Sequence, residues 1–153
     1  MFHKFFSRLV RSKLPIVILA LIAAILIYQF HDTIYVGDAP LEITRAVSNE
    51  ERQVGLLGYN ALAENHGILF VFDNEGRYPF HMVGMKFAID FIWISGDGTI
   101  VDITPDAQPQ LANVPNDKVK FYWSALPAKY VIEVNAGWAR RHNVRVGTHV
   151  SRL

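Results

Sequence analysis

The chain has 153 residues, of which 51% are hydrophobic and 19% charged, and it contains no cysteine. This composition allows one domain with a buried core and excludes a disordered chain, disulfides, thiol catalysis, lipoprotein anchoring and cysteine-based zinc sites. Eleven of the 15 Lys and Arg residues and all 14 Asp and Glu residues follow residue 30, so that part has a net charge of −3 and no overall basic surface for nucleic acid.

The N-terminus combines a basic segment, residues 1–13, with a hydrophobic run, residues 14–30. The basic residues are Lys4, Arg8, Arg11 and Lys13. The hydrophobic run would form about 25 Å of helix, at the short end of what crosses a membrane. A cleaved secretory signal has a similar start, but no small-x-small cleavage pattern closely follows the run. We therefore expect an uncleaved transmembrane anchor.

The distribution of positive charge predicts the orientation of this anchor. All four basic residues near the predicted span precede it, and the next one is Arg45. The positive-inside rule then places residues 1–13 in the cytoplasm. Residues 31–40, with Gly37 and Pro40, are expected to be a polar tether, and residues 41–153 a β-domain outside the cytoplasm.

The first elements of this domain are a predicted strand and a predicted helix. Residues 41–47 alternate between apolar and polar side chains, as in a half-buried strand. Ser48 and Glu51 match a capping box, which predicts a helix from Asn49 to about Leu57, with Gly58 as its stop. Gly55 within this helix would weaken it by about 1 kcal/mol relative to alanine.

Further strands are predicted along the rest of the chain. Residues 67–72 form an apolar run buried on both faces, followed by a turn at 73–76. Residues 80–95 are strand-like, and their apolar end forms a hairpin with 99–103 across a Gly-Asp-Gly turn. Residues 104–117 look like a long loop, 119–124 and 129–135 like strands, and 137–143 like one or two helical turns. The pattern favours a β-sandwich or partly open barrel, with a mixed α+β fold as the alternative.

The stretch at residues 80–95 contains a histidine and two methionines, which are possible ligands of a soft metal. His81 and Met82 would point to opposite faces of a strand unless the chain bulges. The chain has only three methionines, too few for the repeated ligands of a soft-metal site. We expect no metal and no cofactor, and the methionines near His81 are expected to fill the core.

Two carboxylates lie within predicted strands. Asp90 interrupts an apolar run, where a carboxylate is costly unless it is solvated or hydrogen-bonded. It is expected either to border a cleft or to accept hydrogen bonds from backbone amides. Glu133 is a similar case and shares a strand face with Asn135. If Asp90 and Glu133 faced each other, one pKa would be raised and the pair could cleave a glycan or peptidoglycan.

The motifs occur in an order that resembles a known family. They are Glu51-Arg52 with Gly55-Leu56, Gly67-Ile-Leu-Phe-Val-Phe72, Phe80-x-Met82 with Ile89-Asp90, Tyr130-Val-Ile-Glu133-Val-Asn135-Ala-Gly137, and Val146-Gly147. This order over about residues 41–150 resembles the domain of unknown function 192 family. The chain departs from it after Phe80, where the family often has Trp-Met-Lys-Asn-Thr.

The resemblance implies a small, mainly β, jelly-roll-like domain that is often exported or membrane-tethered, and it implies no established activity. We expect a non-enzymatic domain that binds an envelope glycan or a protein partner and does not bind nucleic acid. The alternatives are an envelope hydrolase that uses Asp90 and Glu133, and a structural module of a membrane complex. The candidate ligand-binding residues are Phe80, His81, Met82, Asp90, Glu133 and Asn135.

Overall fold

The computed structural model of the protein describes residues 32–153. The predicted cytoplasmic segment and the predicted anchor at residues 14–30 lie outside the described residues. Within 32–153, no helix is long and apolar enough to cross a membrane. Residues 33–153 form one unit of the chain, and the fold below is that of this unit.

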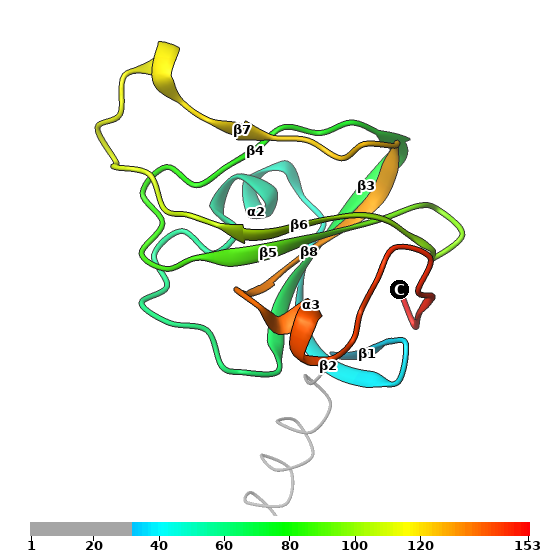
Figure 1. Ribbon diagram of the computed structural model, residues 1–153. Coiled ribbons are helices and arrows are strands. Elements are labelled where there is room, and N and C mark those ends of the chain that lie inside the picture. Colours follow the sequence, from blue (N-terminus) through cyan, green and yellow to red (C-terminus); the bar gives the residue numbers. More distant parts are fainter. Residues whose placement is uncertain (1–31) are drawn as a thin grey trace, which may run out of the picture. The chain divides into compact units, whose positions relative to one another are not determined.

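The domain is mainly β, with two short α-helices (Figure 1). This confirms the mainly β class predicted from the strand pattern. The elements are β1 (Asp32–Val36), β2 (Ala39–Ala46), α2 (Asn49–Val54), β3 (His66–Gly76), β4 (Phe80–His81), β5 (Ile89–Ile94), β6 (Ile100–Ala107), a 3-10 turn (Asn116–Lys118), β7 (Phe121–Tyr122), β8 (Ala128–Asn135), α3 (Trp138–Arg141) and β9 (Val150–Ser151).

Seven of the strands form one curled sheet in the order β6-β5-β8-β3-β2-β1-β9. The sheet curls into a half-barrel, and it agrees with the predicted partly open barrel at this level of description. β2 and β3 are parallel, because the connection through α2 brings the chain back to the end of the sheet at which β2 began before β3 starts. β4 and β7 pair with each other as a separate antiparallel ribbon.

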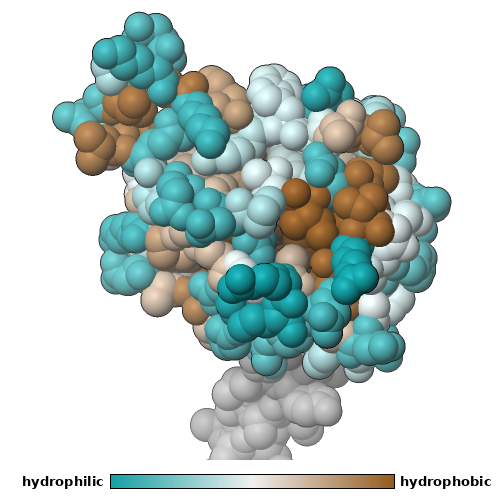
Figure 2. All heavy atoms as spheres, in the orientation of Figure 1, coloured by the Kyte–Doolittle hydropathy of each residue, from teal (hydrophilic) through white to brown (hydrophobic). Residues whose placement is uncertain are grey.

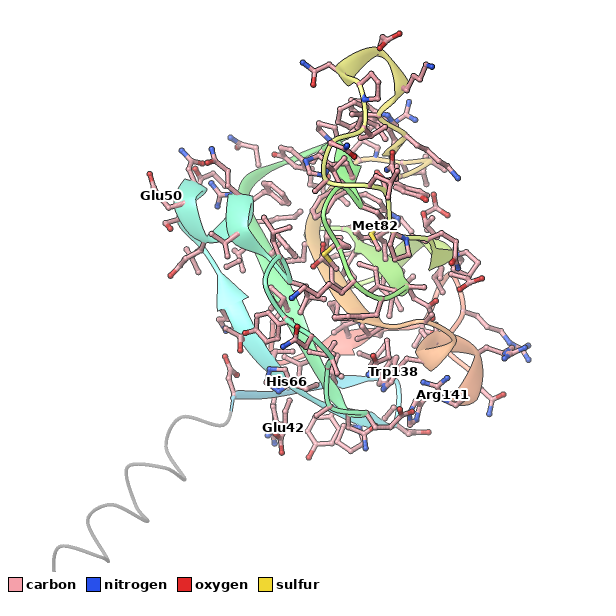
Figure 3. The ribbon with its side chains drawn as sticks, turned by 90° about the vertical axis from the view of Figure 1, so that its left-hand side faces the viewer. Glu42, Glu50, His66, Met82, Trp138 and Arg141 are labelled. Atoms are coloured by element: carbon pink, nitrogen blue, oxygen red, sulfur yellow. The ribbon has the colours of Figure 1, made fainter. Side chains whose placement is uncertain are left out.

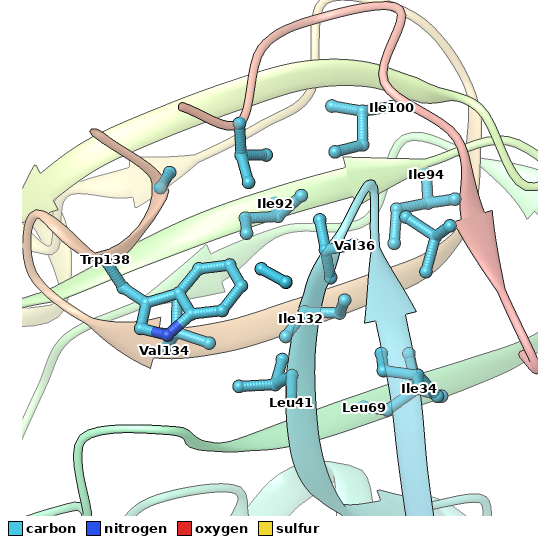
Figure 4. Packing of buried hydrophobic residues seen from close by; sticks show 14 of the residues in the cluster. Ile34, Val36, Leu41, Leu69, Ile92, Ile94, Ile100, Ile132, Val134 and Trp138 are labelled. Carbon is cyan, nitrogen blue, oxygen red and sulfur yellow. The ribbon is translucent and has the colours of Figure 1, made fainter. Parts of the chain in front are cut away.

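The sheet is buried on both of its faces. One face carries an aliphatic core around Trp138, which includes Leu41, Leu69, Ile92 and Ile132 (Figure 4). The other face carries a core rich in aromatic side chains, around Phe91 and Trp93, on which Leu56, just after α2, and the β4–β7 ribbon pack. All six residues of β5 are buried, so both sets of alternating side chains in this strand face a core.

The predicted tether is wrong for the residues that the structure describes. Residues 32–36 form β1, and a turn at Gly37 and Asp38 joins it to β2. Ile34 and Val36 are fully buried in the core around Trp138. The two apolar side chains are too few to indicate a strand by themselves, and β1 is held by its neighbours β2 and β9.

Several predicted boundaries also differ. The helix ends at Gly55, which has φ +45° and serves as its C-cap, rather than at Gly58. β3 continues through the predicted turn at 73–76, with an irregular register after Val71. Residues 80–95 are not one strand, because β4 ends at His81 and β5 begins at Ile89. The hairpin of β5 and β6 is confirmed, and β6 extends to Ala107 into the predicted loop.

Candidate functional site

A pocket of about 410 Å³ lies between α2, the aromatic face of the sheet and the segment that leads into β4. We call it the α2 pocket. Its lining comprises Asn49, Arg52, Gln53, Val54, Gly55, Leu56 and Leu57 from α2 and the following turn, Phe70 and Phe72 from β3, Tyr78, Pro79, Phe80, His81, Val83 and Met85, and Glu133 from β8. The volume is in the usual range for sites of small molecules.

One wall of the pocket is α2, whose start is fixed by the predicted capping box. The Ser48 hydroxyl accepts from the amide of Glu51 (3.1 Å), and the Glu51 carboxylate accepts from the amide of Ser48 (2.8 Å). These bonds satisfy backbone groups that a helix terminus leaves without intrahelical partners. The six-residue helix therefore has a defined start, which positions Arg52 and Gln53 at the pocket.

The end of α2 passes close to the floor of the pocket at Gly55. A Cβ atom on Gly55 would lie 3.0 Å from Cζ of Phe70 and 3.5 Å from Oε2 of Glu133. Its φ of +45° is also in the left-handed region, which side chains rarely adopt. Glycine is required here for both reasons, and it lets the backbone close over the carboxyl group.

Glu133 forms the polar part of the pocket floor. Its side chain projects from β8 and is only 6% exposed. The backbone amide of Leu56 donates a hydrogen bond to the carboxyl group, but Oε2 is buried without any hydrogen-bond partner. Burial raises the pKa of Glu133 to about 8, against the smaller opposing effect of the Leu56 amide. The group is therefore mostly protonated and uncharged at neutral pH.

Aromatic rings make up the opposite wall. Phe72 and Tyr78 stack with 3.6 Å between ring centroids, and Phe80 packs edge-on against Phe70 at 5.0 Å. The guanidinium of Arg52 lies 5.2 Å from the centroid of Phe72 and donates to the carbonyl oxygens of Val71 (2.8 Å) and Val47. The wall is thus apolar, with a cation held at its edge by backbone acceptors.

Three of the six candidate residues from the sequence meet at this pocket, namely Phe80, His81 and Glu133. Met82 does not, because its side chain is fully buried in the core around Phe91 (Figure 3). This confirms the expectation that Met82 fills the core. His81 and Met82 lie on opposite sides of the chain, the first exposed and the second buried.

Asp90 has a structural environment on the other face of the sheet. Its Oδ1 accepts from the backbone amides of Asp106 (2.9 Å) and Gly137 (3.0 Å), and its Oδ2 accepts from that of Ala139 (3.1 Å). The carboxylate therefore joins the end of β6 to the start of α3. The sequence left two roles open for Asp90, and in the structure it acts as an acceptor for backbone amides. Asp90 also borders a second pocket, together with Arg140 and Arg145.

Asp90 and Glu133 do not face each other. In the pairing of β5 with β8, Asp90 is opposite Val134 and Phe91 is opposite Glu133. Paired residues of an antiparallel ladder share a face and neighbours along a strand alternate, so the two carboxyl groups project from opposite faces of the sheet. The carboxylate pair considered from the sequence is wrong, because a shift of one position in the ladder separates them.

Asn135, the remaining candidate, fixes the long connection between α2 and β3. Its side-chain amide donates to the carbonyl oxygens of Leu62 (3.0 Å) and Ala63 (3.1 Å). It is absent from the lining of the α2 pocket. This role follows from contacts 72 and 73 positions away in the chain, which no local pattern reveals.

No pattern in the sequence marks Arg52, Tyr78, Phe72 or Gly55 as parts of the site. The density of aromatic residues between positions 70 and 80 is the signal that could have indicated a wall. No local pattern brings that wall to α2, because the contact is made by Arg52 with Val71 and Phe72 of β3.

The model of the domain of unknown function 192 family, which is described as "Uncharacterized ACR", matches residues 33–152. A solved structure of a proposed transcription regulator from Sinorhizobium meliloti 1021 superimposes with a TM-score of 0.69 at 27% identity, covering 78% of this chain and 91% of that one. A protein of unknown function from Novosphingobium aromaticivorans DSM 12444 has the same TM-score at 22% identity, covering 78% and 83%. A comparison with curated proteins gives no match.

Proposed function

The chain belongs to the domain of unknown function 192 family, and we propose that its domain binds an uncharged glycan of the cell envelope in the α2 pocket. The proposal includes the arrangement predicted from the sequence, with an anchor at residues 14–30 and the domain outside the cytoplasm. The observation that carries it is Oε2 of Glu133, a buried oxygen without a partner at the floor of a pocket with aromatic walls.

A glycan matches the chemistry of this floor. A protonated carboxyl group both donates and accepts hydrogen bonds, so Glu133 can bind a hydroxyl or acetamide group without a counter-charge. A ligand hydroxyl would supply the partner that Oε2 lacks, and an unpartnered buried polar group is costly to the fold. Sugars also present apolar C–H faces, which pack on aromatic rings such as Tyr78.

Binding is favoured over hydrolysis by the number of acidic groups. Glycosidases of the common type need two carboxyl groups across one bond. Within residues 32–153, Glu133 is the only Asp or Glu that lines the α2 pocket, and Asp90 projects from the other face of the sheet. A single acid with a raised pKa can hold a neutral ligand but lacks the second group of the hydrolytic pair.

Nucleic-acid binding, which the description of the Sinorhizobium protein would suggest, receives less support here. The net charge after residue 30 is −3, whereas binding to phosphates needs a concentration of Lys and Arg. The rim of the α2 pocket contributes a single guanidinium, that of Arg52, which already donates to backbone carbonyl oxygens.

Calorimetric titration of the full chain with N-acetylglucosamine and with chitotetraose tests the proposal. The detergent should be dodecyldimethylamine oxide, because its head group is not a sugar. We expect binding of both sugars by the wild type. Glu133→Gln should bind with similar affinity at pH 7, since an amide also donates and accepts. Glu133→Leu should lose binding.

Thermal unfolding of the two variants provides the control. Glu133→Leu removes a buried oxygen without a partner, but it also removes the acceptor of the Leu56 amide. A cooperative unfolding transition in this variant would show that it is folded and that its loss of binding does not come from misfolding. Wild-type affinity in the Leu variant, or no sugar binding by the wild type, would overturn the proposal.

A further inference from the structure

The β4–β7 ribbon has an inner and an outer face with different surroundings. On the inner face, Phe80 is paired with Tyr122, and both rings contact Phe91, with centroid distances of 5.3 and 5.5 Å. On the outer face, His81 is paired with Phe121. The inner face packs on the sheet, so the position of the outer face is fixed by the core beneath it. Figure 1 shows the ribbon at the side of the domain away from β1 and β2.

The outer face carries three adjacent rings, those of His81, Phe121 and Trp123. Their centroids are 6.0 Å apart from His81 to Phe121 and 6.5 Å from Phe121 to Trp123. Phe121 is 45% exposed and Trp123 is 48% exposed. Hydrophobic side chains elsewhere also reach the surface, in patches between hydrophilic ones (Figure 2). This group differs because its rings are in a row, with Phe121 next to both others, on a ribbon fixed by the core, as in binding surfaces.

The three rings continue the α2 pocket. His81 lines the pocket and also contacts Phe121, so a ligand that leaves the pocket past His81 next meets Phe121 and Trp123. The rings are inclined to one another by 74° and 50°. A flat ligand could not lie against all three, whereas a chain of rings that turn about their linkages could.

The charges on this surface match an uncharged ligand. Phe121 and Trp123 carry no charge. The nearby cations are engaged elsewhere: Nζ of Lys120 lies 4.7 Å from the centroid of Tyr122 on the inner face, and Nε of Arg77 donates to the carbonyl oxygen of Ser124 (2.8 Å). An anionic lipid surface or a nucleic acid would require cations beside the rings. An uncharged polymer does not.

We propose that His81, Phe121 and Trp123, which we call the ribbon track, bind successive sugars of a linear uncharged glycan whose end or branch occupies the α2 pocket. This inference rests on the proposed function and names its ligand as a polymer rather than a single sugar. The three rings supply apolar contact to the sugar faces, and Glu133 supplies the polar contact in the pocket.

The tryptophans of the chain provide a direct readout. The chain has three, and Trp93 and Trp138 are fully buried while Trp123 is half exposed. Quenching of fluorescence by iodide therefore reports mainly on Trp123. In dodecyldimethylamine oxide, chitotetraose should protect the full chain from iodide, whereas saturating N-acetylglucosamine, which fills only the pocket, should give little protection.

Affinities of matched variants separate the track from the pocket. Trp123→Ala should weaken chitotetraose binding about tenfold, the loss typical of a buried aromatic anchor, and leave N-acetylglucosamine binding unchanged. Trp123→Phe should retain most of the affinity for the tetramer. Leu126→Ala is the control, because Leu126 is 56% exposed and apolar but has no ring, and it should bind both sugars as the wild type does.

The possible results are distinct. Equal tetramer affinity in the wild type and Trp123→Ala would overturn the ribbon track while leaving the pocket in place. An equal loss in Leu126→Ala and Trp123→Ala would overturn it in favour of a general apolar surface for a protein or lipid. Binding that depends on Trp123 but not on Glu133 would support the track and contradict the pocket. Absence of binding to both sugars would contradict both proposals.

Discussion

Two buried acidic residues one ladder position apart have opposite surroundings. Asp90 accepts hydrogen bonds from three backbone amides, whereas Glu133 has one amide partner and an oxygen with none. The donors around Asp90 satisfy both of its oxygens, whereas a carboxyl group buried with few donors, such as Glu133, is neutralised. The contrast identifies Asp90 as a structural residue and Glu133 as the candidate for ligand binding.

Asp90→Asn should destabilise the domain by about 3 kcal/mol, because a bond to a charged acceptor is lost and an amide N–H would face the N–H of Ala139. The measurement is the free energy of unfolding in urea. Asp97→Asn is the comparison, since Asp97 lies in the exposed hairpin turn and should have a smaller effect. Similar losses in both variants would contradict the role of Asp90.

Glu133 should make stability depend on pH. Its folded pKa of about 8 is above the ordinary value of 4.5, so the folded state binds the proton more tightly than the unfolded state. The stabilisation is complete below pH 4.5 and is lost as the pH rises through about 8. Tm measured from pH 4.5 to 9 should therefore fall more in the wild type than in Glu133→Gln. Parallel curves for the two proteins would contradict the raised pKa.

At the scale of the element, α2 is a six-residue helix that depends on its cap. Isolated helices of this length are unstable in water, and none of its residues is buried. Its defined interactions are the caps at its ends and the contacts of Arg52 with Val71 and Phe72 of β3. The capping box at Ser48 and the close approach at Gly55 therefore hold the wall of the pocket in place. Since no buried side chain fixes α2, a substitution on its exposed surface that weakens the helix would also alter the wall of the pocket.

Ser48→Ala should lower the free energy of unfolding by about 1 kcal/mol, because the amide of Glu51 loses its acceptor. Urea denaturation gives this value. Glu50→Ala changes an exposed acidic residue in the same turn without removing the capping box, and it should cost less. If the two variants lose the same stability, the cap is not what defines the start of α2.

At the scale of the whole domain, the half-barrel is closed at one edge by strands from both ends of the described chain. β1 pairs with β9, with Tyr35 opposite Ser151 and Val36 opposite Val150. Ile34, Val36 and Val150 all belong to the core around Trp138. The folded domain therefore includes β1, and a start at residue 41 removes part of the core.

A chain that begins at Leu41 should be much less stable than one that begins at Asp32, because it lacks two side chains that each contribute about 1.5–3 kcal/mol when fully buried. Soluble yield and the midpoint of urea unfolding compare the two chains. Equal midpoints would show that β1 is a dispensable edge strand, as the prediction of a tether implied.

The sequence by itself determined the features that depend on neighbouring residues. Spacing and alternation within a few residues predict the capping box of α2 and the hairpin of β5 and β6. They also predict the buried run of β3, and they identify β8 as a strand. The mainly β class follows from them. The burial of Met82 was also predictable. A chain with few methionines offers no repeated ligand pattern for a metal, which leaves core filling as the expected role of this side chain.

Only the tertiary structure decided what depends on pairing between distant segments. Nothing local places Asp90 and Glu133 on opposite faces, because their relation is set by the register of β5 with β8. β1 becomes a strand only beside β2 and β9. The α2 pocket likewise exists because β3 and β8 bring Glu133 beneath Gly55. Side-chain alternation is a property of one strand, whereas register and burial are properties of the assembled sheet.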